Sequence, residues 1–269
     1  MIETIKQRYH YPFILLKQLV KTDFQLRYQG STLGYLWTLI RPLAIFAILY
    51  VVFAKFLRVG DAVPYYAVYL LLGIMLWNYF VEVTSGSVEA IVGKGDLLRK
   101  INFPKYIVVL TGSVSATINL LINSLVLAGF MFYFGADPSL SAIVVMPLLF
   151  AELFAFSLGV GFWLSALYVR FRDVQYIWEV ALQGAFYATP ILYPLSFVPE
   201  AAAKILMLNP IAQIIQDARR VLVTPESITI GDIYGNPWAR LIPLAIMLVV
   251  SVTAAIYFRK RSRFFAEEV

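Results

Sequence analysis

The sequence predicts an all-α integral membrane protein with six spans. Only 14% of its 269 residues are charged, whereas soluble domains carry roughly 25%. The mean hydropathy is +0.77, and six stretches come near or exceed the ~20 apolar residues that a helix needs to cross a bilayer. The predicted spans cover residues 33–56, 65–88, 105–134, 142–169, 174–193 and 241–258 of a single domain, 1–269.

Ahead of the first span, residues 1–30 predict an amphipathic helix. Phe13, Leu16 and Phe24 recur at helical spacing, while Lys17 and Lys21 take another face. A helix of this kind lies in the membrane interface with its apolar side against the lipid.

The first span contains an arginine, Arg41, directly before a proline. If the span began after Arg41, only about 15 residues would remain before Arg58, fewer than the ~20 that a bilayer requires. We therefore place Arg41 within the inner-leaflet part of the span, buried against protein or paired with an anion. The alternatives are that its head group reaches the interface or pairs with Glu82 or Glu152.

A cytoplasmic segment between the second and third spans, residues 93–104, predicts a short helix. Asp96 is its expected N-cap, and Leu97, Leu98 and Ile101 share an apolar face. That face favours a protein partner. The alternative is a basic loop that touches anionic lipid head groups.

The fifth span carries polar residues along one side, because steps of three and four keep a single helical face. Asp173 is its expected N-cap. Such a stripe must face protein or water, so we interpret it as the wall of a path; the alternative is polar packing between helices. The first span adds an aromatic stripe, whose alternative is ordinary core or lipid-facing aromatics. The stripe residues are Tyr176, Glu179, Gln183, Tyr187 and Pro190 on the fifth span, with Tyr35, Phe46 and Tyr50 on the first.

The segment 194–239 is too apolar for a solvated loop. Asn209 and Pro210 divide it into two short helical pieces, about 201–208 and 211–221. We expect them to dip back into the outer leaflet or to roof a cavity, where protein or water satisfies their backbone.

The basic residues predict the orientation. Of the 22 Lys and Arg residues, 15 lie in segments 1–30, 90–105, 170–173 and 259–269. Positive charge marks the cytoplasmic side, so both termini are expected there. The net charge of +6 is thereby explained as an orientation signal and indicates no nucleic-acid partner.

No catalytic or metal-binding set assembles from the sequence. There is no cysteine, and the single histidine, His10, lies outside every span. The chain lacks G-x-x-x-x-G-K-[ST] and H-E-x-x-H and any paired-carboxylate motif. We expect no enzyme activity, no cofactor and no ATP hydrolysis by this chain.

Several segments resemble the membrane subunit of ABC-2 type polysaccharide exporters, the family that exports O-antigen, teichoic acid and capsule. The likeness covers nearly the whole chain in order. The segments are RYQGSTLGYLWTLIRPL (27–43), LLLGIMLWNYF (70–80), LLRKINFPK (97–105), RFRDVQYIWEVALQGAFYATPILYPLSFVP (170–199) and LNPIAQIIQDAR (208–219).

The resemblance implies a homodimer in the cytoplasmic (inner) membrane with two separate ATPase subunits, which bind ATP and Mg, and a glycan on undecaprenyl diphosphate as substrate. It implies a channel lined by the first and fifth spans. Arg donors match phosphate geometry, so Arg27 and Arg41 are candidates to meet the diphosphate. The resemblance further implies ATPase coupling through Asp96, Leu97, Leu98, Ile101 and Phe103, and an external gate that includes Pro190, Pro194, Asn209 and Pro210. The alternatives are export of a small amphiphile or drug, and a membrane glycosyltransferase or polymerase.

Overall fold

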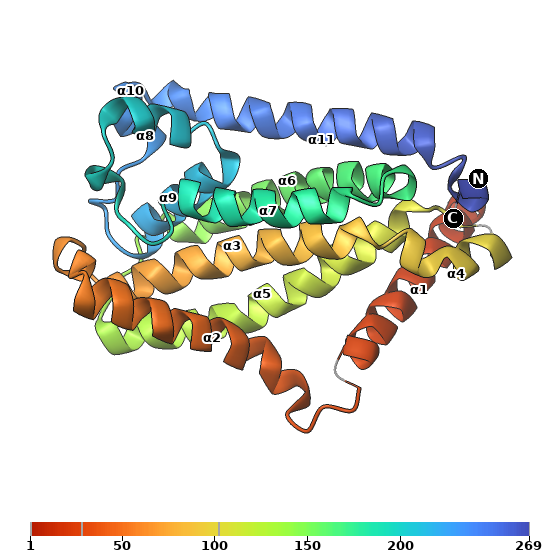
Figure 1. The fold of residues 1–269 in the computed structure, drawn as a ribbon, viewed down its shortest axis with the longest axis horizontal. Helices are drawn as coiled ribbons and strands as arrows, with labels where there is room; N and C mark the ends of the chain where they lie inside the picture. The colour runs from red at the N-terminus through yellow and green to blue at the C-terminus, as the bar shows by residue number, and fades with distance from the viewer. Residues whose placement is uncertain (1, 28, 102, 269) are drawn as a thin grey trace.

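The computed structural model describes residues 2–27, 29–101 and 103–268, which form helices and connecting turns, with no strand in these ranges (Figure 1). The α-helices are α1 (Ile2–Arg27), α2 (Trp37–Tyr50), α3 (Tyr66–Val88), α4 (Gly95–Lys100), α5 (Tyr106–Phe134), α6 (Ala142–Arg170), α7 (Val174–Ala188), α8 (Glu200–Leu206), α9 (Pro210–Leu222), α10 (Ile230–Tyr234), α11 (Leu241–Arg261) and α12 (Phe265–Glu268). A π-helical turn, Val51–Phe56, extends α2.

Five helical segments are long and apolar enough to cross a membrane. They are Gly34–Phe56, Tyr66–Val88, Tyr106–Phe134, Ala142–Arg170 and Pro237–Arg261, each within a few residues of a predicted span. The helix in the predicted span 174–193 is shorter than expected: α7 has 15 residues, or about 22 Å at 1.5 Å per residue, against a hydrocarbon core of ~30 Å. The six-span topology therefore stays a prediction.

Helix α3 forms the centre of the bundle. In its most apolar window 83% of the residues are buried, against 6% for the segment that contains α2. It contacts α2, α5, α6, α7 and α9, and α2 and α7 lie on its two sides in Figure 1. The main hydrophobic cluster gathers around it, so the sites described below are built on or beside this helix.

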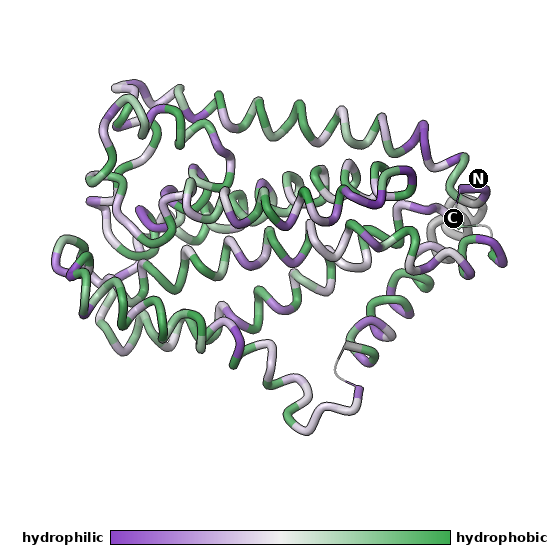
Figure 2. The backbone as a smooth tube through the Cα atoms, in the orientation of Figure 1, coloured by the Kyte–Doolittle hydropathy of each residue, from purple (hydrophilic) through white to green (hydrophobic). Residues whose placement is uncertain are grey.

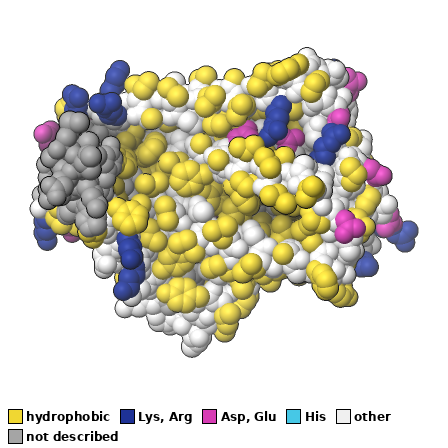
Figure 3. All heavy atoms as spheres, turned by 180° about the vertical axis from the view of Figure 1, so that it is seen from behind, with side chains coloured by type: hydrophobic (Ala, Val, Ile, Leu, Met, Phe, Trp, Pro, Cys, Tyr) yellow, Lys and Arg dark blue, Asp and Glu magenta, His cyan; other side chains and the backbone are white. Residues whose placement is uncertain are grey.

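The distribution of apolar and polar residues on the surface is that of a membrane protein. Apolar residues dominate the middle of the long helices, and hydrophilic residues are more frequent toward the ends of the bundle (Figure 2). The face opposite to that of Figure 1 shows mainly hydrophobic side chains, with most charged ones nearer the two ends (Figure 3). This distribution suits the bilayer, where intramembrane charge is costly.

Small residues bring three helices close together. A Cβ on Gly159 would lie 2.9 Å from the Cα of Ser251, and one on Gly161 would lie 2.5 Å from Ser87 Oγ. These glycines let α6 approach α11 and α3, as small residues do in membrane bundles. At the first crossing Ser251 Oγ also donates to the carbonyl of Ala155 at 3.1 Å.

Helices α1, α4 and α12 pack at one end of the bundle. Leu98, Phe103 and Phe265 are buried in a second cluster there, against which Leu16 and Leu19 of α1 pack. The predicted N-terminal helix is thus present. Helix α1 begins and α12 ends at this same end (Figure 1), and the side of the membrane that it faces stays a prediction.

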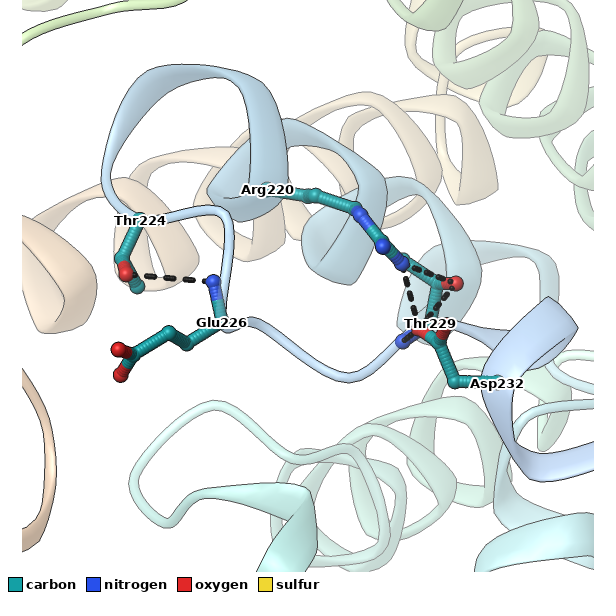
Figure 4. Close-up of polar contacts among 5 residues, drawn as sticks. All are labelled: Arg220, Thr224, Glu226, Thr229 and Asp232. Carbon is teal, nitrogen blue, oxygen red and sulfur yellow. Dashed lines mark hydrogen bonds and ion pairs between the residues drawn. The ribbon is translucent and has the colours of Figure 1, made fainter.

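The opposite end is closed by α8, α9 and α10. Arg220 Nη1 lies 3.1 Å from Thr229 Oγ1 and also pairs with Asp232, while the Thr229 N–H donates to Asp232 Oδ2 at 2.8 Å (Figure 4). In the intervening turn Thr224 Oγ1 accepts the N–H of Glu226 at 3.3 Å. These contacts tie the end of α9 to the start of α10.

Candidate functional site

The polar stripe of α7 points away from its own subunit. Tyr176 and Tyr187 are 67% and 68% exposed, and Glu179 and Gln183 are exposed as well. The opposite side of α7 is fixed to α3 by Trp178, whose Nε1 donates to Thr84 Oγ1 at 3.2 Å. Asp173 takes the predicted N-cap position but makes no side-chain capping bond. The channel-lining role of the stripe stays a prediction.

The prediction that Pro190 continues this stripe is wrong. Helix α7 ends at Ala188, and Thr189 has φ −95° and ψ 134°, the extended conformation that a residue before proline prefers. Thr189 and Pro190 turn inward and are buried. The stripe therefore stops at Tyr187.

The non-helical segment 189–193 is held by hydrogen bonds from side chains. Arg219 of α9, with no exposed surface, donates to the carbonyls of Pro190 and Ile191 at 2.5 and 2.7 Å. The Tyr66 hydroxyl donates to the carbonyl of Leu192 at 2.7 Å. Non-helical backbone within a membrane protein needs such partners.

Arg219 also reaches α3, where its Nη2 donates to the carbonyl of Tyr69 at 3.1 Å. A Cβ on Gly73 would lie 2.6 Å from that nitrogen, so only glycine leaves room for the guanidinium. The sequence alone assigned no role to Arg219. The available signal was an arginine within the apolar run of a segment already judged too apolar for a loop.

The predicted gate residues belong to the same connection. Pro194 and Pro210 are buried. Asn209 Oδ1 accepts the N–H of Ile211 at 3.0 Å and so caps α9, and its Nδ2 donates to Thr189 Oγ1 at 3.3 Å. The two predicted helical pieces are present as α8 and α9, and α9 is largely buried against α6, α3 and α11. A gating role for these residues stays a prediction.

The expectation that Arg41 is buried against protein is not met, and its pairing with an anion stays a prediction. Arg41 is exposed, and among the described residues no ion pair joins it to Glu82 or Glu152. It borders a pocket of about 590 Å³ between α2, α3 and α5. Glu82 lies in this pocket and accepts a hydrogen bond from Asn119 Nδ2 at 2.7 Å. Arg27 ends α1, and its side chain lies outside the described part of the structure.

The first-span aromatics do not share one environment. Tyr35 is 58% exposed, whereas Phe46 is 7% exposed and meets Phe130 edge to face at 5.4 Å. Tyr50 is half-buried and stacks on Tyr66 with ring centres 6.4 Å apart. Phe46 is therefore a core residue of the single subunit, which favours the alternative interpretation at that position.

The predicted coupling helix is present as α4, with two differences. Asp96 lies inside the first turn and Lys94 takes the N-cap position, so the predicted cap is wrong. Leu98 and Phe103 are 5% and 6% exposed and pack inside their own subunit. Ile101, at 40% exposed, and Asp96 remain available to a partner.

Leu97 of α4 and Lys94, its N-cap residue, face neighbouring parts of the chain. Leu97 is half-buried against the second cluster. Burial lowers the pKa of the Lys94 ammonium, and the Asp23 carboxylate of α1 partly offsets this effect. The coupling role of α4 stays a prediction.

A charged cluster joins α6, α9 and the start of α11. Arg240 Nε lies 3.1 Å from Asp217 Oδ2, and Arg240 Nη2 lies 3.9 Å from Glu152 Oε2. Gln213 Nε2 donates to the same Asp217 oxygen at 2.6 Å. Within the described ranges no group of three His, Cys, Asp or Glu side chains could hold a metal. The cluster is an ion-paired joint between helices.

Comparison with known proteins agrees with the motifs. A model of the ABC-2 type transporter family matches residues 14–223. An O-antigen export system permease protein, RfbA, of Klebsiella pneumoniae is 32% identical over 79% of this chain and 82% of its own. RfbA of Myxococcus xanthus is 28% identical over the full length of both chains, and the polysialic acid transport protein KpsM of Escherichia coli is 20% identical over 78% of this chain and 81% of its own. The chain belongs to the ABC-2 type transporter family.

Proposed function

We propose that the chain is the membrane subunit of an ATP-driven exporter that moves a lipid-linked, O-antigen-like polysaccharide across the inner membrane. The observation that carries this is the exposed polar and aromatic face of α7 on an otherwise apolar body. Aromatic faces offer flat platforms to the C–H faces of sugars, and polar groups at membrane depth mark substrate paths. The names of the two RfbA relatives, which match most or all of this chain, support the same substrate class.

A second copy of the chain completes the channel. The stripe of α7 and most of α2 are uncovered in one subunit, and hydrocarbon is an unfavourable neighbour for Glu179 and Gln183. Pairing two subunits would place both faces along a shared path. Both termini would be cytoplasmic, with the external gate at the end formed by α8, α9 and α10.

Two ABC ATPase subunits, which bind ATP and Mg, supply the energy. They dock at the end that carries α4, with Asp96 and Ile101 presented to them. Because Leu98 and Phe103 pack with Ile107 of α5 and Phe258 of α11, a displacement of α4 would move these spans as well. Opening of the path follows from that movement.

The undecaprenyl diphosphate of the substrate meets Arg41, and Arg27 is its second candidate contact. The guanidinium of Arg41 is exposed, and its planar fork of N–H donors fits phosphate oxygens.

Glycan display on cells tests the proposal. A strain that lacks its own export permease would receive this chain with its ATPase, and surface glycan would be detected with an antibody. Replacing both Glu179 and Gln183 by Leu should reduce display sharply, whereas Ile177→Leu, on the exposed side of the same helix but off the stripe, should not. Normal display by the double variant would refute the stripe as the path.

A change in drug susceptibility without glycan display would favour export of a small amphiphile, and product formation from a sugar-nucleotide donor would favour an enzyme.

A further inference from the structure

The pocket between α2, α3 and α5 lies apart from the stripe of α7. Its volume of about 590 Å³ falls within the roughly 300–1,000 Å³ of small-molecule sites. Helix α2 supplies Trp37 and Arg41, α3 supplies Asn78 and Glu82, and α5 supplies Asn119. Few pockets at membrane depth would gather an arginine, a carboxylate and two amides without a polar ligand, because such groups are costly there.

Asn119 is the strongest indication that a ligand belongs in this pocket. Its side chain is 6% exposed, and its Nδ2 is committed to Glu82 Oε1 at 2.7 Å. Its Oδ1 is buried and accepts no hydrogen bond from the described residues. A buried acceptor without a donor is unfavourable, and a ligand hydroxyl would supply the missing donor once the Asn119 side chain turns toward the pocket.

The side chain of Asn123 ties two helices together beside the pocket. Asn123 Nδ2 donates to the carbonyl of Asn119 at 2.8 Å and to the carbonyl of Thr38 at 3.3 Å. The second bond fixes the start of α2 to α5. Trp37, one residue earlier, is 46% exposed and offers an indole face at the rim.

The pocket side chains suit three chemical features of a ligand. Arg41 offers a fork of donors suited to a phosphate. Asn119 and Glu82 offer acceptors suited to hydroxyl groups, and Trp37 offers an apolar face suited to the C–H side of a sugar ring. A phosphate joined to a polyol satisfies all three at once.

We propose that this pocket binds the first sugar of the lipid-linked glycan, with the adjoining phosphate at Arg41 and the ring hydroxyls at Asn119 and Glu82. This inference rests on the proposed function. It assigns the pocket a task beyond transport: the permease distinguishes carrier lipid that bears a sugar from carrier lipid that does not.

Binding to the purified permease in nanodiscs tests the assignment with three probes. They are a polyprenyl diphosphate that bears one hexose, the same lipid without sugar, and phosphatidylglycerol, which offers a phosphate and glycerol hydroxyls. We expect the wild type to bind the sugar-bearing lipid at least about tenfold more tightly than the sugar-free one. The sugar adds several hydrogen bonds to charged or buried side chains, which the sugar-free lipid does not make.

The variants separate the two halves of the pocket. Asn119→Leu and Glu82→Gln should abolish the preference for the sugar-bearing lipid and leave sugar-free binding unchanged, whereas Arg41→Ala should weaken both. Glu226→Gln, the same charge change on an exposed turn outside the pocket, should change neither. If Asn119→Leu does not fold, Asn78→Ala replaces it, because Asn78 lines the pocket and its side chain makes no hydrogen bond to a described residue.

Equal binding of the sugar-bearing and sugar-free lipids would overturn the assignment. So would phosphatidylglycerol binding as tightly as the sugar-bearing lipid, which would make the pocket a site for bulk lipid head groups. Glycan display in the same strain keeps the two proposals apart. Display without sugar preference refutes only the pocket, whereas absence of display from a folded permease–ATPase complex refutes the proposed function.

Discussion

Replacing Arg219 by Met should strongly destabilise the protein around the segment 189–193. Methionine retains much of the apolar length but none of the donors. The carbonyls of Pro190 and Ile191 would lose the only hydrogen bonds that they accept among the described residues, while the carbonyl of Tyr69 lies inside α3. Each buried carbonyl left without a donor costs about 1–3 kcal/mol. Two give about 2–6 kcal/mol, and relief of the buried cation offsets part of this, so we expect about 2–4 kcal/mol.

Gly73 supplies an independent check. A Cβ there would lie 2.6 Å from Arg219 Nη2, so Gly73→Ala should displace the guanidinium and destabilise the wild type. In the Arg219→Met background the same change should cost little, because the displaced group is gone. Residues in contact show such non-additivity, whereas distant ones add.

The assay is unfolding in mixed micelles as dodecyl sulfate is added, followed by tryptophan fluorescence. Arg220→Met is the matched control: its partner Asp232 is exposed, and exposed ion pairs are worth about 0–1 kcal/mol. Strict additivity of the Gly73 and Arg219 changes, or an Arg219→Met variant as stable as the Arg220→Met control, would refute the reasoning.

Three further predictions rest on other contacts. Gly161→Ala should destabilise the α3–α6 crossing, because its Cβ would meet Ser87; Gly112→Ala, with nothing within 4 Å of its Cβ, should be neutral in the same unfolding assay. Arg240→Ala should cost about 1–2 kcal/mol, since it strands two largely buried carboxylates while its own partial exposure limits the loss; a fully stable variant would contradict this. The chain has no native cysteine, so single cysteines can be placed on α4: one at Ile101 should crosslink to the ATPase and one at the buried Leu98 should not, and the reverse pattern would mean that α4 turns its other face to the partner.

Hydropathy and length placed the long helices well. The predicted spans 65–88 and 142–169 differ from α3 and α6 by no more than one residue at either end, because a run of apolar residues of bilayer length has few other stable structures. The motifs likewise identified the family. The position of a long helix and the family assignment each depend on many residues, so a single atypical residue does not change either prediction.

Side-chain direction was harder to predict. Leu98 lies on the apolar face of a short amphipathic helix, and such a face can be covered by a partner or by the same chain; here the chain covers it with residues far away in sequence. Phe46 is similar, since its neighbour Phe130 lies on α5. Spacing assigns residues to a face but does not determine what packs against it.

At the end of α7, a proline in the sequence is accompanied by contacts with residues far away in the chain. Helix α7 ends before Pro190, and the carbonyls of the non-helical segment that follows accept hydrogen bonds from Tyr66 of α3 and Arg219 of α9. The pocket acceptor Glu82 lies on the same α3, about 20 Å along the axis from Tyr69 at 1.5 Å per residue. A largely buried helix transmits displacement because close-packed interiors do not deform continuously. If the pocket binds the proposed ligand, α3 offers a direct connection from Glu82 to the segment 189–193, and a substitution that loosens α3 from α6 should then change both ligand binding and the position of that segment.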